Sequence, residues 1–167
     1  MPLSFRGIYE ITLNSGPVYI DAGEFPMVFN NILATNDVKC MPDSTELCLV
    51  DQQTKFLCRE SGWYHFEISG HTINYSLPDP SADQYWIDIS VKYQPQNLAV
   101  QVVRKFHNYT PGRDPVYPPE GRRFVVFRFN HYMMVNSKLW LENNKYHTFV
   151  RGPEQFKFKL VAYQYTR

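Results

Sequence analysis

Apolar and polar side chains alternate along this sequence with a period of two residues. In the window 61–70, Tyr64, Phe66 and Ile68 share one face of an extended chain, and Trp63, His65 and Glu67 share the other. The windows 85–93, 122–132 and 155–165 follow the same period, which is typical of β-strands with one buried face. No window of a dozen residues shows the apolar stripe of an amphipathic helix. We therefore predict an all-β fold made of antiparallel sheets.

Weaker strand patterns occur near 6–13, 17–20, 25–33, 46–51, 97–107, 137–142 and 146–150. Short strands separated by polar turns point to a two-sheet sandwich or a barrel. The alternating windows also predict which side chains are buried, namely Tyr64, Phe66, Ile87, Ile89, Phe127, Phe129, Phe158 and Leu160.

Length and charge narrow the functional classes. The 167 residues suit one domain spanning 1–167. The net charge of +1 gives no basic footprint for nucleic-acid binding. No apolar run of the length needed for a membrane span occurs, and the first residues lack the apolar core of a signal peptide. We therefore expect no nucleic-acid partner and no membrane span.

Cys58 and His65 are the residues that come nearest to a nucleophile and its base. They are seven positions apart, and an odd separation on an unbroken strand places two side chains on opposite faces. A nucleophile needs its base within hydrogen-bonding reach. The other histidines and the carboxylates show neither zinc-type spacing nor a paired arrangement. We predict that Cys58 is not catalytic, that the protein is not an enzyme, and that it has no metal site and no cofactor.

The three cysteines, Cys40, Cys48 and Cys58, allow two arrangements. One disulfide with one free thiol suits an oxidising compartment, whereas three buried thiols suit the cytosol. If the chain is extracellular, a Cys48–Cys58 or a Cys40–Cys48 bridge is expected.

Two groups of residues are candidates for binding. The segment 108–123 carries four prolines, two glycines and three arginines, and it is expected to be a long surface connection. Tyrosine and arginine are enriched where binding energy concentrates. We predict that this loop binds a partner through Tyr109, Arg113, Tyr117, Arg122 and Arg123; the alternative is a solvated spacer. The second group comprises Trp63, Trp86 and Trp140, whose rings could stack on sugars if they lie on an outer face.

Two stretches together resemble a known superfamily. "FPMVFNNIL" precedes "KFLCRESGWYHFEIS", and the chain closes with the aromatic strand "FKFKLVAYQY". These stretches resemble the globular heads of the first complement component's q subunit and its relatives, in the superfamily that includes tumour necrosis factor. Phe29, Asn30 and Leu33 fit the first part of the pattern, and Phe56, Cys58, Gly62, Tyr64 and Phe66 fit the second. The family's glycine between the closing aromatics is absent, since Lys157 stands between Phe156 and Phe158.

The resemblance implies a two-sheet jelly roll of about ten strands. It also implies a compact homotrimer, with aromatic side chains along the threefold axis and ligands bound on outer loops. Jelly rolls build virus capsids and surface knobs as well. The expected function is a non-enzymatic trimeric recognition or assembly module, located in a virion or outside the cell, that binds a protein receptor or a surface glycan. The alternative is a monomeric carbohydrate-binding sandwich.

Overall fold

The computed structural model describes residues 2–12, 17–19, 27, 29, 31–34, 47–73, 84–110, 122–143, 149–151 and 157–166. Every regular element within these ranges is a β-strand. The strands are β1 (Leu3–Thr12), β2 (Pro17–Tyr19), β3 (Asn31–Ala34), β4 (Cys48–Val50), β5 (Lys55–Leu57), β6 (Gly62–Ile73), β7 (Gln84–Gln94), β8 (Gln101–Thr110), β9 (Arg122–Met133), β10 (Lys138–Asn143), β11 (Phe149–Arg151) and β12 (Lys157–Tyr165). Within the described part of the chain, no helix is long and apolar enough to cross a membrane.

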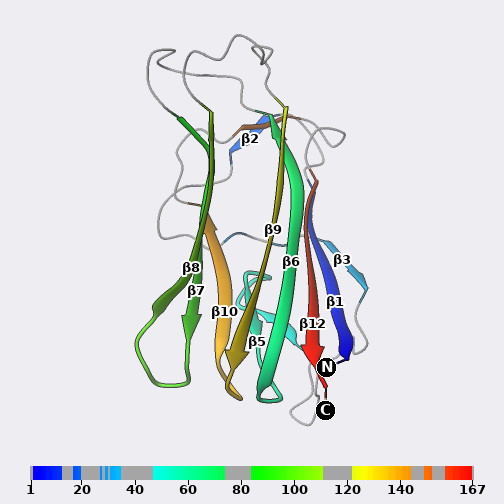
Figure 1. The fold of residues 1–167 in the computed structure, drawn as a ribbon, viewed down its shortest axis with the longest axis vertical. Coiled ribbons are helices and arrows are strands. Elements are labelled where there is room, and N and C mark those ends of the chain that lie inside the picture. Colours follow the sequence, from blue (N-terminus) through cyan, green and yellow to red (C-terminus); the bar gives the residue numbers. More distant parts are fainter. Residues whose placement is uncertain are drawn as a thin grey trace.

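Ten of these strands form two antiparallel sheets. One has the order β3-β1-β12-β6-β9 and the other the order β4-β5-β10-β7-β8, while β11 and β2 form a small separate pair. The long strands run side by side along the long axis, and both termini lie at one end (Figure 1). At that end, the backbone amide of Thr166 donates a hydrogen bond of 3.0 Å to the carbonyl oxygen of Pro2. The expected two-sheet antiparallel jelly-roll sandwich is confirmed; the single domain spanning 1–167 stays a prediction.

The core follows from the alternation along the strands. Of the side chains predicted to be buried, five are 5% exposed or less, namely Tyr64, Phe66, Ile89, Phe129 and Leu160. Phe127 is only partly buried and packs against this core. The side chains of Ile87 and Phe158 lie outside the described part of the structure.

Aromatic rings link the two sheets across the core. Phe56 of the β4-β5-β10-β7-β8 sheet packs edge-on against Tyr9 of β1, with ring centroids 4.8 Å apart. Within the β3-β1-β12-β6-β9 sheet, Phe66 of β6 stacks on its cross-strand partner Phe129 of β9 at 5.0 Å. At one side of the sandwich, Phe106 of β8 stacks on Phe127 of β9 at 4.0 Å. Aromatic pairs of this kind add about 0.5–1.5 kcal/mol each beyond the area that they bury.

Some expected boundaries differ from the structure. The segment 108–123 was expected to be a surface connection, but β8 continues to Thr110; at the other end β9 begins at Arg122, as the alternation over 122–132 predicts. Both strand ends are paired within their sheets, because Thr110 of β8 pairs with Gln84 of β7 and Arg122 of β9 pairs with Ile73 of β6. Only 111–121 lies between the two strands, and these residues are outside the described ranges. The strand expected at 97–107 begins later, at Gln101, because a turn with Asn97 at a φ of 60° precedes it.

Candidate functional site

The outer surface of the β3-β1-β12-β6-β9 sheet carries a cluster of rings. In one cross-strand row, Phe5 lies beside Tyr163, Tyr163 beside His65, and His65 beside Asn130. Trp63 and Tyr132 form another pair towards the end of the same face. We call the set Phe5, Trp63, His65, Val126, Tyr132, Tyr163 and Tyr165 the aromatic face. Three of its members are strongly exposed: Trp63 at 50%, Val126 at 67% and Tyr132 at 45%.

His65 is held in the middle of the aromatic face. Its Nδ1 lies 2.6 Å from Oδ1 of Asn130, and its Nε2 lies 3.1 Å from Oε1 of Glu67. The hydroxyl of Tyr165 donates to the same Asn130 oxygen over 3.3 Å. The imidazole ring of His65 also packs against the ring of Tyr163, with centroids 6.1 Å apart. These contacts fix the ring as part of a packed surface.

A pocket opens at the end of this face, beside the two termini. It encloses about 600 Å³, and its walls include the side chains of Arg6, Glu60, Trp63, Tyr132, Gln164 and Tyr165. We call it the terminal pocket. It is assembled from the first strand, the β5–β6 turn, the end of β9 and the last strand. Trp63 and Tyr132 pack edge-to-face within it, with ring centroids 5.7 Å apart.

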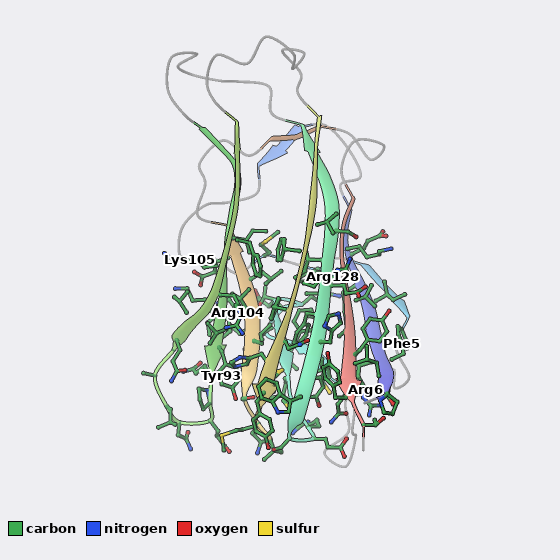
Figure 2. All side chains as sticks on the ribbon, viewed as in Figure 1. Phe5, Arg6, Tyr93, Arg104, Lys105 and Arg128 are labelled. Atoms are coloured by element: carbon green, nitrogen blue, oxygen red, sulfur yellow. The ribbon has the colours of Figure 1, made fainter. Side chains whose placement is uncertain are left out.

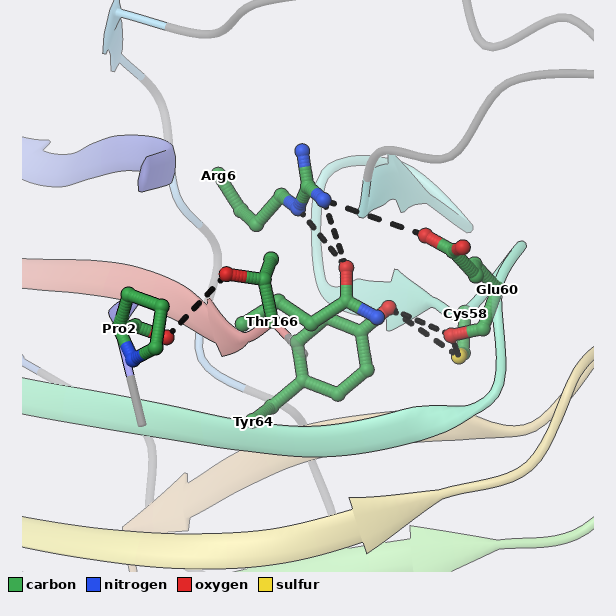
Figure 3. A network of polar contacts seen from close by, with 7 residues as sticks. Pro2, Arg6, Cys58, Glu60, Tyr64 and Thr166 are labelled. Carbon is green, nitrogen blue, oxygen red and sulfur yellow. Dashed lines mark hydrogen bonds and ion pairs between the residues drawn. The ribbon is translucent and has the colours of Figure 1, made fainter. Parts of the chain in front are cut away.

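Polar contacts fix the floor of the terminal pocket (Figure 3). Both Nε and Nη2 of Arg6 donate to Oε1 of Gln164, over 3.0 and 2.7 Å. Nη2 of Arg6 also lies 3.9 Å from a carboxylate oxygen of Glu60. Gln164 itself is 5% exposed. Two donors on one acceptor hold the guanidinium in one orientation, so the pocket has a fixed cation at its base, with the half-exposed carboxylate of Glu60 at 3.9 Å from it.

Cys58 lies beneath this network and is a free, fully buried thiol. Its Sγ donates to the carbonyl oxygen of Glu60 over 3.0 Å, and burial raises the pKa of the thiol to about 11. His65 contacts Asn130 and Glu67 on the outer face instead. Within the described residues, the arrangement gives Cys58 no base, which agrees with the expected structural role. It also excludes the Cys48–Cys58 bridge.

Cys48 is disulfide-bonded, and its partner lies outside the described residues. Because the chain has three cysteines and Cys58 is free, the Cys40–Cys48 alternative remains as the prediction. Among the residues that the structure describes, no group of three metal-ligating side chains comes together.

The structure separates the three candidate tryptophans. Trp63 lies half-exposed in the terminal pocket. Trp140 is 4% exposed, its indole N–H donates to Glu142 over 3.0 Å, and Lys55 lies 4.3 Å from its ring centroid. Because the Trp140 ring is covered, sugar stacking there is excluded in this structure. Trp86 lies in β7, and its side chain is not among those described.

The proposed binding loop is only partly placed. Tyr109 lies near the end of β8, and Arg122 and Arg123 begin β9. Arg113 and Tyr117 are outside the described ranges, as are the side chains of the other three residues. Arg6, Glu60 and Gln164 could not be identified from the sequence, because these residues come from three distant segments and form no local motif.

Comparison with known proteins gives a match in structure but not in sequence. No family model matches the chain, and no curated protein matches it. The Eiger TNF structure from S. frugiperda has a TM-score of 0.64 at 10% identity, over 98% of this chain and 94% of that one. The globular domain of zebrafish complement 1qA protein has a TM-score of 0.57 at 12% identity, over 100% and 99% of the two chains. Murine APRIL has a TM-score of 0.55 at 8% identity, over 93% and 97%. The expected resemblance in fold, to the jelly roll of tumour necrosis factor and the complement heads, is confirmed.

Proposed function

We propose that this chain is a non-enzymatic recognition or assembly module that works as a homotrimer. The observation that carries the proposal is the aromatic face, whose rings gather towards one end of the outer surface of the β3-β1-β12-β6-β9 sheet. An exposed cluster of apolar and aromatic side chains of this kind marks a protein contact. The resemblance supports three copies, because domains of this fold class are expected to pack aromatic side chains along a threefold axis.

Charged groups lie on both sheets. Lys92 lies 3.4 Å from Glu142 and Lys138 lies 2.7 Å from Asp51 on the β4-β5-β10-β7-β8 sheet and its turns. Glu67 and Arg128 lie opposite one another on the β3-β1-β12-β6-β9 sheet. The feature that favours the aromatic face as a contact is its exposed apolar and aromatic surface. On the aromatic face, Val126 is 67% exposed in the middle of a strand. Covering this side chain, together with the rings of Trp63 and Tyr132 further along the same strands, would remove apolar surface from water.

Solution mass tests the proposal. Light scattering at micromolar protein concentration is expected to give three times 19.7 kDa. The Val126→Arg substitution places a charge in the proposed contact of every copy, and unpaired buried charges are strongly destabilising, so this variant is expected to dissociate. Val102→Arg is the matched control, since Val102 is 49% exposed on β8 of the other sheet.

Each outcome bears on a specific part of the proposal. A wild-type mass of 19.7 kDa would refute the trimer and favour the monomeric carbohydrate-binding alternative. A trimer that Val126→Arg leaves intact would place the subunit contact on another face. Dissociation of both variants would point to a general loss of stability, which thermal unfolding of each variant would detect.

Partner binding is assigned to the segment 108–123. Prolines at 111, 115, 118 and 119 restrict the unbound chain and so lower the entropy lost on docking. Tyr109, Arg113, Tyr117, Arg122 and Arg123 supply rigid rings and positive charge for an acidic partner or a neighbouring subunit. The Arg113→Ala/Tyr117→Ala variant is expected to elute from a heparin column at lower salt, or to lose trimer mass. If both properties match the wild type, the segment is a spacer.

The cellular setting is proposed as a virion or the extracellular space. The disulfide at Cys48 supports folding in an oxidising compartment, since disulfides persist there. Mass spectrometry of protein from its native source, with and without reductant, tests this part. A fully reduced Cys48 in native material would argue for assembly in the cytosol.

A further inference from the structure

We propose that the terminal pocket binds one unit of an uncharged saccharide. Side chains of a single copy build the pocket, but Trp63, Tyr132 and Tyr165 also belong to the aromatic face. The inference goes beyond the proposed trimer and rests on a subunit contact that leaves the mouth of the terminal pocket open. Its volume of about 600 Å³ falls within the range of pockets that bind small ligands, roughly 300–1,000 Å³. A single hexose unit fits within a space of this size.

The walls combine two kinds of surface. Trp63, Tyr132 and Tyr165 supply aromatic rings, while Arg6, Glu60 and Gln164 supply polar groups. A sugar ring has the same division, with an apolar face of C–H groups and a rim of hydroxyls. Trp63 is half-exposed, so part of its indole remains open for the C–H face. Carboxylate, amide and hydroxyl oxygens accept hydrogen bonds, and guanidinium and amide N–H groups donate them, which suits hydroxyls that do both.

The charges in the pocket select against ions. The guanidinium of Arg6 and the carboxylate of Glu60 lie 3.9 Å apart, so the pocket carries one positive and one negative charge side by side. An anionic ligand would be repelled by Glu60, and a cationic ligand by Arg6. A neutral ligand with many hydroxyl groups can instead hydrogen-bond to both residues. The pairing therefore favours a neutral saccharide over a sulfated, sialylated or ammonium-bearing ligand.

The pocket is also preorganised. Gln164 fixes Arg6 through contacts of 3.0 and 2.7 Å, and Tyr132 packs edge-on against the Trp63 ring at 5.7 Å. The hydroxyl of Ser61 in the adjoining turn accepts a hydrogen bond of 2.7 Å from the amide of Val135, which ties the β5–β6 turn to the β9–β10 turn. A site whose groups are already held in place loses little entropy when a ligand binds.

The test uses the full chain and a defined panel of probes. Saturation-transfer difference NMR with glucose, galactose, mannose, fucose and N-acetylglucosamine, plus N-acetylneuraminic acid as a charged probe, reports binding without a label. At least one neutral sugar is expected to bind saturably with a millimolar Kd. Trp63→Ala is expected to weaken it at least about tenfold, since truncating a buried ring contact at a binding site costs on that scale. Glu60→Gln, which keeps the shape of the side chain, is expected to weaken binding by a smaller factor.

Leu98→Ala is the matched control, because Leu98 is 61% exposed on the β7–β8 hairpin and lies outside the pocket wall. It is expected to bind as the wild type does. The proposal is overturned if no neutral sugar saturates, if only the charged probe binds, or if Trp63→Ala binds equally well. It is also overturned if Trp63→Ala changes the solution mass without changing sugar binding, because Trp63 then serves a subunit contact. The trimer proposal is tested separately, by the solution mass of the wild type and of the Val126→Arg variant.

Discussion

Cys58 and Tyr64 donate hydrogen bonds to the same carbonyl oxygen, that of Glu60. The thiol sulfur lies 3.0 Å and the phenol oxygen 2.6 Å from this acceptor, and the two donors are 3.7 Å apart (Figure 3). Both side chains are fully buried. The relationship supports the prediction that Cys58 has a structural role, because its proton is directed at a backbone oxygen and water does not reach the sulfur.

We expect native Cys58 to resist alkylation. Burial raises the pKa of its thiol from 9.0 to about 11, so the reactive thiolate at neutral pH is about a hundredfold scarcer than for an ordinary thiol. The raised pKa also means that the folded state holds this proton more tightly than the unfolded state. Its contribution to stability is therefore complete below about pH 9 and is lost as the pH rises towards 11. Iodoacetamide labelling followed by peptide mass spectrometry measures the rate. Labelling as fast as that of free cysteine would contradict the burial.

Replacement of Phe66 by alanine is expected to cost about 3–5 kcal/mol of unfolding free energy. Phe66 is fully buried and stacks on Phe129 at 5.0 Å, so truncation leaves a cavity in the middle of the core. The control is Leu98→Ala on the exposed hairpin, which is expected to stay within about 0.5 kcal/mol of the wild type. Guanidinium denaturation monitored by circular dichroism gives both values. Equal effects of the two substitutions would mean that the core lies elsewhere.

The alternation along the strands was enough to predict an all-β fold and part of the core, and the resemblance supplied the choice of a jelly roll over a barrel. A period of two depends only on neighbouring residues, so Tyr64, Phe66 and Leu160 could be assigned to the inner face from the sequence. The burial of Phe127 was harder to predict. Its exposure depends on how β9 meets β8 of the other sheet, and the alternation along β9 alone does not show this. It stacks there on Phe106 at 4.0 Å and remains only partly buried.

The terminal pocket could not be predicted from the sequence. Arg6 and Gln164 are separated by 158 positions, and Glu60 comes from a turn between them. These residues meet because β1 and β12 pair antiparallel at the two ends of the chain, with Leu3 opposite Tyr165. Nothing local distinguishes them from solvated polar residues. Of the pocket's residues, only Trp63 could be singled out beforehand, because a tryptophan on an outer face is unusual.

His131 is expected to make folding sensitive to mild acid. Its ring packs edge-on against Tyr93, with centroids 4.4 Å apart. Burial lowers the pKa of the His131 imidazole, and the nearby guanidinium of Arg104 lowers it further (Figure 2 labels Tyr93 and Arg104). The unfolded state therefore binds a proton more readily than the folded state does. Stability is expected to fall as the pH drops below about 6.5, because protonation then favours unfolding.

The Arg104→Gln substitution tests this assignment. Without the guanidinium, the pKa of His131 is expected to rise towards its ordinary value, and the loss of stability in mild acid is expected to shrink. An NMR titration of the histidine ring protons measures the pKa directly. Lys105→Gln is the control, since it removes the same charge from the neighbouring position on β8, and Lys105 is not among the causes of the shift. An equal change in both variants would show that net charge, not the local contact, sets the pKa.

Gly62 is expected to be required for the floor of the terminal pocket. A Cβ at this position would lie 2.9 Å from Nε2 of Gln164, so Gly62→Ala must push the amide aside. The displaced amide would give up its bonds to Arg6, whose side chain is 12% exposed. Hydrogen bonds to charged groups contribute about 1.5–3 kcal/mol, and we expect Gly62→Ala to lose about 1–2 kcal/mol of that stability. A double-mutant cycle with Gln164→Ala isolates the cause. In the Gln164→Ala background the cost of Gly62→Ala is expected to disappear, and an undiminished cost there would assign the role of Gly62 to the backbone of β6 instead.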